Sequence, residues 1–384
     1  MTPHRRRFLK IGSLAAVLAA LPARASHALI QAAMQGKRIV RLAAPENLES
    51  DFGAAAEFIT PTDQHYVRSH FAVPQVDLAA WTLQVKGAVG QPLTLTLEQL
   101  RALPKISKVV TLECAGNGRQ FLNPPVAGVQ WERGAVSTAE WTGVRLADLL
   151  AKAGVATDAT RVVFEGVDKG EVKNTPFPGG PIAFNRSLSL EDARARDVFV
   201  AFAINGQPIP ASQGAPVRLI VPGCYGMASV KWLSSVEVIK GESGSYWETT
   251  DYAYWDRSSG YPRRRPLLGL QVKSLIARPS PNGQVTRGTM TEIAGMAWSD
   301  GTVTRVEVST DGGTTWRDAE FIDPESAVTW RRWRHRWQVP ATGAEAVLMS
   351  RATDAKGRTQ PMTRNADYGT YVIHHVVPTP VKIA

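Results

Sequence analysis

The chain has 384 residues, of which 44% are hydrophobic and 20% are charged, and its formal net charge is +10 at pH 7. This length exceeds the roughly 250–300 residues at which a single hydrophobic core usually divides, so more than one domain is expected. Five basic residues and no acidic ones lie within the first 25, so the rest of the chain has a formal net charge of +5. The remaining arginines are mostly scattered or lie beside acids, which argues against a nucleic-acid partner.

Residues 1–25 have the three regions of an export signal. A basic start, "MTPHRRRFLK", precedes an apolar stretch, "IGSLAAVLAALP", and "ARA" at 23–25 has the form of a signal-peptidase site. The apolar stretch is shorter than the ~20 residues that cross a bilayer, so no membrane span is predicted. Because the three regions occur in order, a merely disordered basic tail is the weaker interpretation. The "RRRFLK" sequence predicts a twin-arginine signal and a periplasmic protein.

The sequence of residues 50–255 predicts a mixed α+β domain. Thr96 and Gln99 form a capping box that opens a short helix, and apolar residues at helical spacing between 146 and 153, followed by Gly154, predict another. Strands and long helices do not alternate regularly, and no G-x-G-x-x-G motif follows a strand, so a doubly wound fold is not expected. Strand-like runs lie at 81–89, 108–114, 161–168, 197–206, 217–223 and 229–239.

A linker, "WDRSSGYPRRRPLLG", is predicted from residue 255, and the pattern changes after it. In residues 268–384 apolar side chains alternate with polar ones, as in Val306 and Val308 before the Asp311-Gly312-Gly313 turn. This period of two predicts a β-sandwich. Tryptophans of this region are expected on an exposed face, which favours a role in assembly, namely a homodimer.

Cys114 is one of two cysteines and ends the strand-like run 108–114, directly before "AGNGR". It could be a small buried hydrophobe, a nucleophile, or a metal ligand. Its immediate neighbours supply arginine, and no histidine that would hold it as the thiolate a nucleophile needs. No second Cys or His stands at metal-site spacing, so a single soft ligand to a metal whose other ligands are not from the protein fits best. Cys224 is expected to serve packing.

An ordered series of sequence blocks resembles the molybdenum domain of the sulfite oxidase family. The later block "GMAWSDGTVTRVEVSTDGGTTWRDA" is similar to that family's immunoglobulin-like dimerisation domain, and the resemblance covers roughly residues 55–375. It implies a molybdopterin-binding α+β domain followed by an immunoglobulin-like β-sandwich. The blocks of the first domain are "TLECAGNGR", "GVQWERGAVSTAEWTGVRLADLL", "FEGVD", "GAPVRLIVPG", "SVKWLSSVEV" and "YWETTDY".

The resemblance also implies roles for individual residues. Cys114 would be the thiolate ligand of molybdenum in a molybdopterin cofactor. Arginine and lysine suit both the cofactor phosphate and a sulfur oxyanion. The purely structural alternatives are that the arginines form surface ion pairs, that Trp131 and Tyr252 are core aromatics, and that His70 braces a loop. The implied cofactor contacts are Tyr66, Arg68, His70, Asp168, Arg218, Ser229, Val230 and Lys231, and the implied catalytic and substrate residues are Arg68, Arg119, Trp131 and Tyr252.

Two positions depart from the family pattern. Gln213 stands where animal and plant members usually have His in the phosphate-binding loop. The last arginine of their substrate pocket has no counterpart in "NADYGTYV", where Asp367 or Tyr368 stands. The pocket therefore lacks one positive charge, so sulfite binds more weakly, a nearby cation (His374, His375 or Arg364) substitutes, or the substrate is another sulfur compound.

These observations predict a periplasmic molybdenum enzyme of the sulfite dehydrogenase type. The chain has no C-x-x-C-H haem attachment sequence, and two cysteines are too few for an iron–sulfur cluster, so electrons are expected to pass to a separate c-type cytochrome. The alternative activity is reduction of S-oxides such as methionine sulfoxide. A β-rich binding module with a vestigial site is the non-enzymatic alternative.

Overall fold

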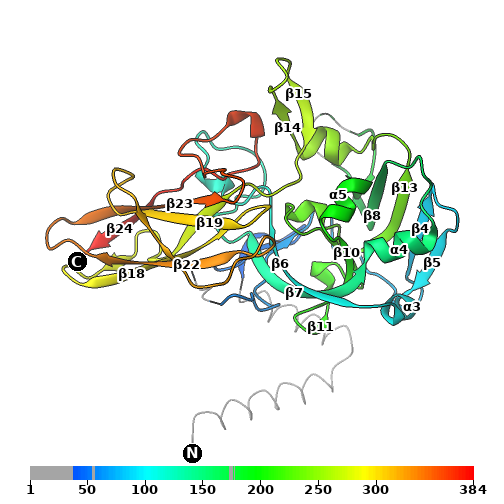
Figure 1. Cartoon of the computed structure of the whole chain (residues 1–384), viewed down its shortest axis with the longest axis horizontal. Helices are drawn as coiled ribbons and strands as arrows, with labels where there is room; N and C mark the ends of the chain where they lie inside the picture. The colour runs from blue at the N-terminus through cyan, green and yellow to red at the C-terminus, as the bar shows by residue number, and fades with distance from the viewer. Residues whose placement is uncertain (1–37, 54–56, 173–175, 177) are drawn as a thin grey trace, which may run out of the picture.

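The computed structural model describes residues 38–53, 57–172, 176 and 178–384, so the predicted export signal lies outside the described residues. They form two lobes that lie side by side (Figure 1). Among them, no helix is both long enough and apolar enough to cross a membrane.

The first lobe contains two five-stranded sheets that are mostly antiparallel. In one of them a single neighbouring pair, Thr82–Gly87 and Leu233–Ile239, is parallel. Mostly antiparallel sheets with a few short helices belong to an α+β domain, as predicted. One sheet consists of β11 (Gln207–Pro208), β10 (Phe199–Ile204), β7 (Val136–Arg145) and β6 (Ile106–Glu113), with β12 (Arg218–Ile220) also pairing with β10. The other has the order β5 (Leu93–Thr96), β4 (Thr82–Gly87), β13 (Leu233–Ile239), β8 (Arg161–Gly170) and β9 (Ile182–Ser189).

Short helices lie beside these sheets. Helix α3 (Leu97–Ala102) begins with the predicted capping box, in which the Thr96 side chain accepts from the Gln99 amide and the Gln99 side chain accepts from the Thr96 amide. Helix α4 (Leu146–Ala153) buries the four predicted apolar residues and ends at Gly154. Both predictions are confirmed. Helix α5 (Leu190–Ala195) was not predicted.

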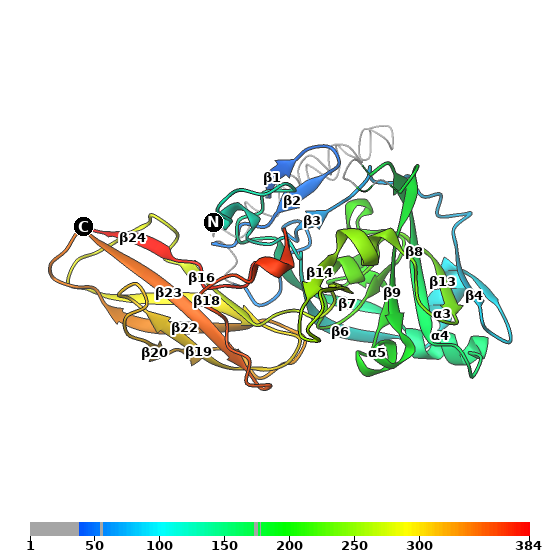
Figure 2. The ribbon, with the colours of Figure 1, turned by 90° about the horizontal axis from the view of Figure 1, so that it is seen from above.

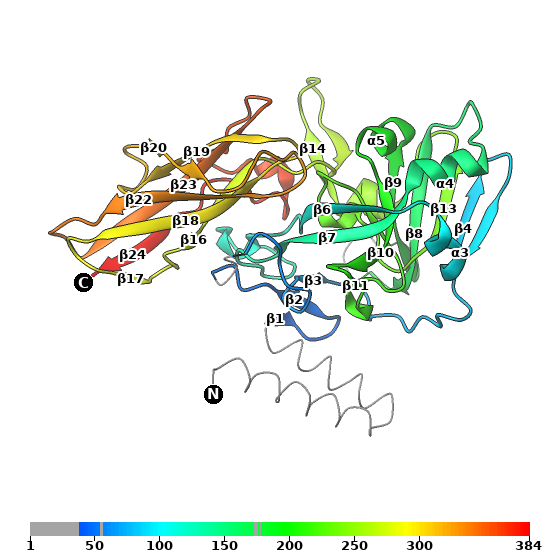
Figure 3. The same cartoon turned by 60° about the horizontal axis from the view of Figure 1, so that its bottom comes forward.

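A small sheet of β1 (Ile39–Leu42), β2 (Asn47–Glu49) and β3 (Val67–Arg68) lies near the boundary between the lobes, as Figures 2 and 3 show. β2 pairs with both β1 and β3. This pairing fixes the segment that carries Arg68 and is followed by Ser69 and His70.

The second lobe is a sandwich of two sheets, as predicted. Apolar side chains from both sheets meet in one core, among them Ile293, Val306 and Leu348. One sheet has the order β16 (Lys273–Arg278), β18 (Met290–Trp298), β22 (Arg331–Gln338) and β21 (Glu320–Phe321). The other has the order β17 (Gln284–Val285), β24 (Thr379–Ile383), β23 (Glu345–Asp354), β19 (Val303–Ser309) and β20 (Arg317–Asp318).

The tryptophans of β18 and β22 do not lie on an exposed face, so that expectation was wrong. Trp333 and Trp337 are buried in the sandwich core, while Trp298 and Trp330 are buried in the main core of the molecule. The period of two was interpreted correctly, but the tryptophans face inward. Their burial within the chain removes the argument that they need a second copy to cover them.

The prediction of a linker was wrong in part. Most of its residues belong to a hairpin of β14 (Ala253–Asp256) and β15 (Arg263–Pro266), which projects from the lobes (Figure 1). At its base the Leu267 amide donates to the Tyr252 carbonyl over 2.8 Å. The lobes share one core, which includes Leu275, Trp298 and Val372 from the second lobe. They are therefore joined by packing as well as by the chain.

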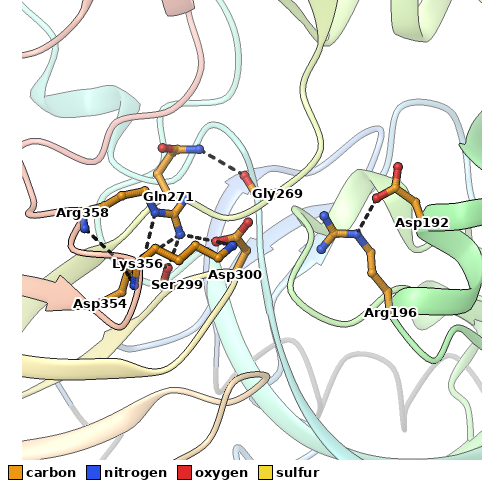
Figure 4. A network of polar contacts seen from close by, with 9 residues as sticks. All are labelled: Asp192, Arg196, Gly269, Gln271, Ser299, Asp300, Asp354, Lys356 and Arg358. Atoms are coloured by element: carbon orange, nitrogen blue, oxygen red, sulfur yellow. Dashed lines mark hydrogen bonds and ion pairs between the residues drawn. The ribbon is translucent and has the colours of Figure 1, made fainter.

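A polar network lies at the boundary between the lobes (Figure 4). On the side of the second lobe, Asp300 pairs with Arg358 and with Lys356, the latter over 3.1 Å. On the side of the first lobe, Arg196 pairs with Asp192 over 3.4 Å. Arg196 and Asp300 both line a cavity between these groups.

Candidate active site

A cavity opens in the first lobe at the ends of several strands. The empty space inside it, which includes the open mouth, is about 600 Å³. Its wall is formed by His65, Tyr66, Arg68, Ser69, His70, Cys114, Ala115, Asp168, Phe184, Gln213, Arg218, Gly226, Met227, Ser229, Lys231, Trp232 and Tyr252. Segments far apart in the sequence therefore meet here, and most of the site residues predicted from the sequence line the same wall.

Cys114 follows directly on β6, which is the place predicted for it. Its amide donates to the Ala135 carbonyl over 2.8 Å, and its carbonyl accepts from the Asn117 amide over 2.9 Å. The chain then turns so tightly that a Cβ on Gly116 would lie 2.3 Å from a guanidinium nitrogen of Arg119. Glycine at 116 therefore lets Arg119 fold back against the loop that holds Cys114.

The surroundings of Cys114 act on its thiol in opposite directions. Burial raises the pKa of Cys114, while the positive charges of Arg68 and Arg119 lower it. The side chain is buried but lies in the cavity wall. A soft sulfur beside two cations suits a thiolate ligand to a metal ion. Among the described residues, no three or more His, Cys, Asp and Glu side chains form a metal-binding group.

Three cations crowd one side of the cavity, namely Arg68, Arg218 and Lys231. Burial and the neighbouring Arg218 hold the pKa of Lys231 well below its usual value, although Asp168 opposes this. Burial likewise raises the pKa of Asp168 to about 6, against the effect of Lys231. With one carboxylate among three cations, this region is suited to an anion such as a phosphate.

Several polar atoms in the wall are buried without a hydrogen-bond partner: His65 Nε2, Asp168 Oδ1 and Arg218 Nε. Buried polar groups are nearly always paired in folded proteins, so three orphaned atoms around one cavity indicate a polar ligand. Both donors and acceptors are among them. This mixture, together with the excess of cations, fits a pterin that carries a phosphate group.

His70 and Tyr252 form a hydrogen-bonded pair in the wall, with 2.6 Å between Nε2 and the hydroxyl oxygen. Burial and nearby cations hold the pKa of His70 well below its usual value, while burial raises that of Tyr252. The direction of this hydrogen bond depends on which imidazole nitrogen carries the proton. The His70 ring also stacks on Phe184 at 4.5 Å between centroids. This contact orients the pair.

Three predicted residues do not line the cavity. Arg119 lies behind Cys114, where its Nε donates to the Thr370 carbonyl over 3.0 Å and its Nη1 to the Val129 carbonyl over 2.7 Å. Trp131 is fully buried in a cluster with Cys114. The Val230 side chain belongs to the main core. Cys224 is also in that core, and burial raises its pKa to about 12, in keeping with packing.

The second lobe holds the Cys114 segment from behind. Glu113 accepts from Lys273 Nζ over 2.8 Å and from Trp298 Nε1 over 2.8 Å. The Val372 amide donates to the Ala115 carbonyl over 2.7 Å. The residues on both sides of Cys114 are therefore fixed by side chains and backbone of the second lobe, which sequence patterns did not indicate.

Neither the residues at the position of the missing arginine nor those suggested to replace it lie in the cavity wall. Asp367 pairs with Arg257 over 2.9 Å, and the Tyr368 ring packs against Tyr254 at 5.2 Å. His374, His375 and Arg364 are likewise absent from the wall. Tyr371 approaches the site instead, with its ring 4.8 Å from that of Tyr252.

Gln213 and His65 lie together in the wall. Gln213 Nε2 donates to the carbonyls of His65 and Tyr66 over 3.2 and 2.8 Å. His65, Ser69, Phe184, Met227 and Trp232 were not predicted as site residues. His65 stands beside the predicted Tyr66 in "HYVRSH", which was the one signal that could have indicated it.

Comparisons with known proteins agree with this geometry. Residues 70–247 match the family model described as the oxidoreductase molybdopterin binding domain, and residues 264–369 match the Mo-co oxidoreductase dimerisation domain. The solved sulfane dehydrogenase SoxCD of Paracoccus pantotrophus superposes with a TM-score of 0.78 at 27% identity, covering 94% of this chain and 90% of that one.

Curated relatives include sulfite oxidases and nitrate reductases. Mouse mitochondrial sulfite oxidase is 39% identical over 323 residues, which are 80% of this chain and 58% of that protein. Chicken sulfite oxidase is 37% identical over 83% of this chain and 71% of its own length. Barley nitrate reductase is 35% identical, but the match spans 37% of its length. The chain belongs to the sulfite oxidase family of molybdopterin enzymes, and its cofactor is a molybdopterin-bound molybdenum.

Proposed function

We propose that this protein is a periplasmic sulfite dehydrogenase, which oxidises sulfite or a related sulfur compound and passes the electrons to a separate c-type cytochrome. The observation that carries the proposal is the position of Cys114, in a cavity wall beside Arg68 and backed by Arg119. A thiolate for the metal and cations for an oxyanion are thus at the same place. The export route proposed is the twin-arginine pathway.

Within this proposal the residues of the chain have separate tasks. Arg218, Lys231 and Ser229 bind the cofactor at the cationic side of the cavity, and Cys114 ligates its metal. The bound group supplies the oxygen-atom and two-electron chemistry. Arg68 attracts and orients the substrate anion from the cavity wall, and Arg119 adds positive charge from behind Cys114. The hydroxyl of Tyr252, which is hydrogen-bonded to His70, lies in the cavity wall and is placed to form a hydrogen bond with substrate or water.

The second lobe is proposed to be immunoglobulin-like and to form a homodimer. This rests on the match of residues 264–369 to the dimerisation domain. Light scattering of the full chain tests it, and a monomer at micromolar concentration would remove the assembly role. A chain truncated before the second lobe is unsuitable for this test, because the lobes share a core.

The test of the activity is sulfite oxidation by the purified, molybdenum-replete protein with ferricyanide as acceptor, alongside metal analysis. We expect turnover that depends on the molybdenum content. Bound metal without sulfite oxidation would refute the proposed substrate, and absence of bound molybdenum in protein from a cofactor-producing host would favour the binding-module alternative. Oxygen uptake measured in parallel separates a dehydrogenase from an oxidase.

A further inference from the structure

Tyr371 brings a group from the second lobe into the substrate region. Its hydroxyl donates to Asp251 Oδ1 over 2.9 Å. Its ring lies 4.8 Å from the ring of Tyr252, and the guanidinium of Arg119 lies over it at 5.2 Å. Tyr371 thus contacts Tyr252 of the cavity wall, Arg119 behind Cys114, and the carboxylate of Asp251.

The backbone around Tyr371 is fixed to the Cys114 loop on both sides. The Thr370 carbonyl accepts from Arg119, and the Val372 amide donates to Ala115. Val372 has a φ of 55°, which is unfavourable for a β-branched residue. Such a conformation persists only where its surroundings hold it, so the position of Tyr371 is specified by the fold rather than incidental.

Asp251 changes the charge of the region. It ends a short π-helix (Trp247–Asp251), a local irregularity that is frequent at functional sites. Its carboxylate interacts electrostatically with Arg68, Arg119 and Arg186. Arg186 also has Glu248 as a carboxylate partner at 3.8 Å. Asp251 therefore offsets one of the two positive charges that Arg68 and Arg119 bring to the substrate.

We propose that the Tyr371–Asp251 pair determines substrate specificity by fitting this site to a sulfur compound with one negative charge rather than two. The proposal rests on the proposed function in taking the region beside Cys114 as the substrate site. A dianion near Arg68 and Arg119 is attracted by them and repelled by Asp251 twice as strongly as a monoanion, while its desolvation cost is about four times as large, so that offsetting one positive charge favours the monoanion. Sulfite exists near neutral pH as both ions, and hydrogen sulfite or a sulfur compound with a single charge is the matched species.

Two anions of fixed charge test the proposal without relying on turnover. Methanesulfonate carries one negative charge and sulfate carries two throughout pH 6–8. Their binding to the full-length, cofactor-loaded protein is measured by calorimetry at constant ionic strength. We expect the wild type to bind methanesulfonate at least as tightly as sulfate. Asp251→Asn should shift the ratio of the two dissociation constants toward sulfate by about tenfold, since a like charge is removed.

Tyr368→Phe is the matched control, because this tyrosine belongs to the same segment but packs against Tyr254. It should leave the ratio unchanged. A wild type that prefers sulfate, an unchanged ratio in Asp251→Asn, or no binding of either anion would overturn the proposal. Sulfite oxidation is assayed in the same preparations. If turnover is absent but the two anions are discriminated as expected, the proposed function alone fails. If sulfite is oxidised but Asp251→Asn leaves the ratio of dissociation constants unchanged, this inference alone fails.

Discussion

Removal of the Lys273 ammonium is expected to destabilise the whole protein, although Lys273 touches neither cofactor nor substrate. Lys273 Nζ lies 2.8 Å from Glu113 Oε1 and 3.0 Å from the Asn117 carbonyl, and both charged side chains are almost fully buried, at 3% and 2% exposure. Lys273→Met leaves the Glu113 carboxylate buried with only neutral donors. Breaking a buried pair in this way costs about 3–5 kcal/mol of unfolding free energy.

Urea unfolding followed by far-ultraviolet circular dichroism measures this loss, and two further variants decide its cause. Lys273→Met combined with Glu113→Gln should recover most of the lost stability, because no unpaired charge remains. Lys240→Met is the control for an exposed lysine: its partner Asp158 lies at 2.5 Å, but both side chains are about 60% exposed (60% and 61%), so no measurable change is expected. Equal losses for the two lysines, or a double variant no better than Lys273→Met, would refute the reasoning.

Three further predictions concern the site. Cys114→Ser should abolish sulfite turnover and lower the molybdenum content while leaving the circular dichroism spectrum unchanged, because a hydroxyl replaces thiolate poorly at a soft metal; near-normal turnover would show that Cys114 is not the ligand. Arg68→Gln should raise KM for sulfite by roughly 10- to 100-fold, the loss of one charge-assisted contact; Arg119→Gln should raise it less, because Arg119 acts through its charge from behind Cys114. Arg263→Gln in the exposed hairpin should leave KM unchanged, and equal effects at all three positions would indicate a general field instead of a pocket. Burial and nearby cations lower the pKa of His65 from 6.5 to about 3. Between these values His65 is protonated in the unfolded chain but neutral in the folded one. The free energy of unfolding therefore falls as the pH drops below 6.5. Between pH 7 and pH 5 His65 should account for a loss of about 2 kcal/mol in the cofactor-free chain, which His65→Gln abolishes and which urea titrations at the two pH values measure.

The local elements were predictable because short-range chemistry determines them. The capping box at Thr96 and the apolar spacing that ends at Gly154 act within a few residues, and both helices form where expected. The strand before Cys114 and the tight turn after it could likewise be predicted from the local sequence. Helix α5 was missed although Ser189 caps it. The tryptophans of β22 were placed on the wrong face because a period of two does not say which face is inward.

The part of the substrate region that the second lobe supplies could not be predicted, because its contacts join distant residues. The Arg119–Thr370 hydrogen bond spans 251 residues, and the Tyr371–Asp251 bond spans 120. No local pattern encodes such pairs. The resemblance led to His374, His375 and Arg364 as replacements for the missing arginine, but Tyr371 is the residue of this segment whose ring packs against Tyr252 of the cavity wall.

The hydrogen bonds from Thr370 and Val372 to the Cys114 loop also bear on how the protein folds. Closing a loop of 251 residues carries an entropic cost, and contacts of high sequence separation form slowly. During synthesis a ribosome must release the whole second lobe before these bonds can form. The first lobe can form its strands early, but the loop that carries Cys114 acquires its final support only when the second lobe docks. Completion of the metal-binding loop is therefore expected among the last events of folding.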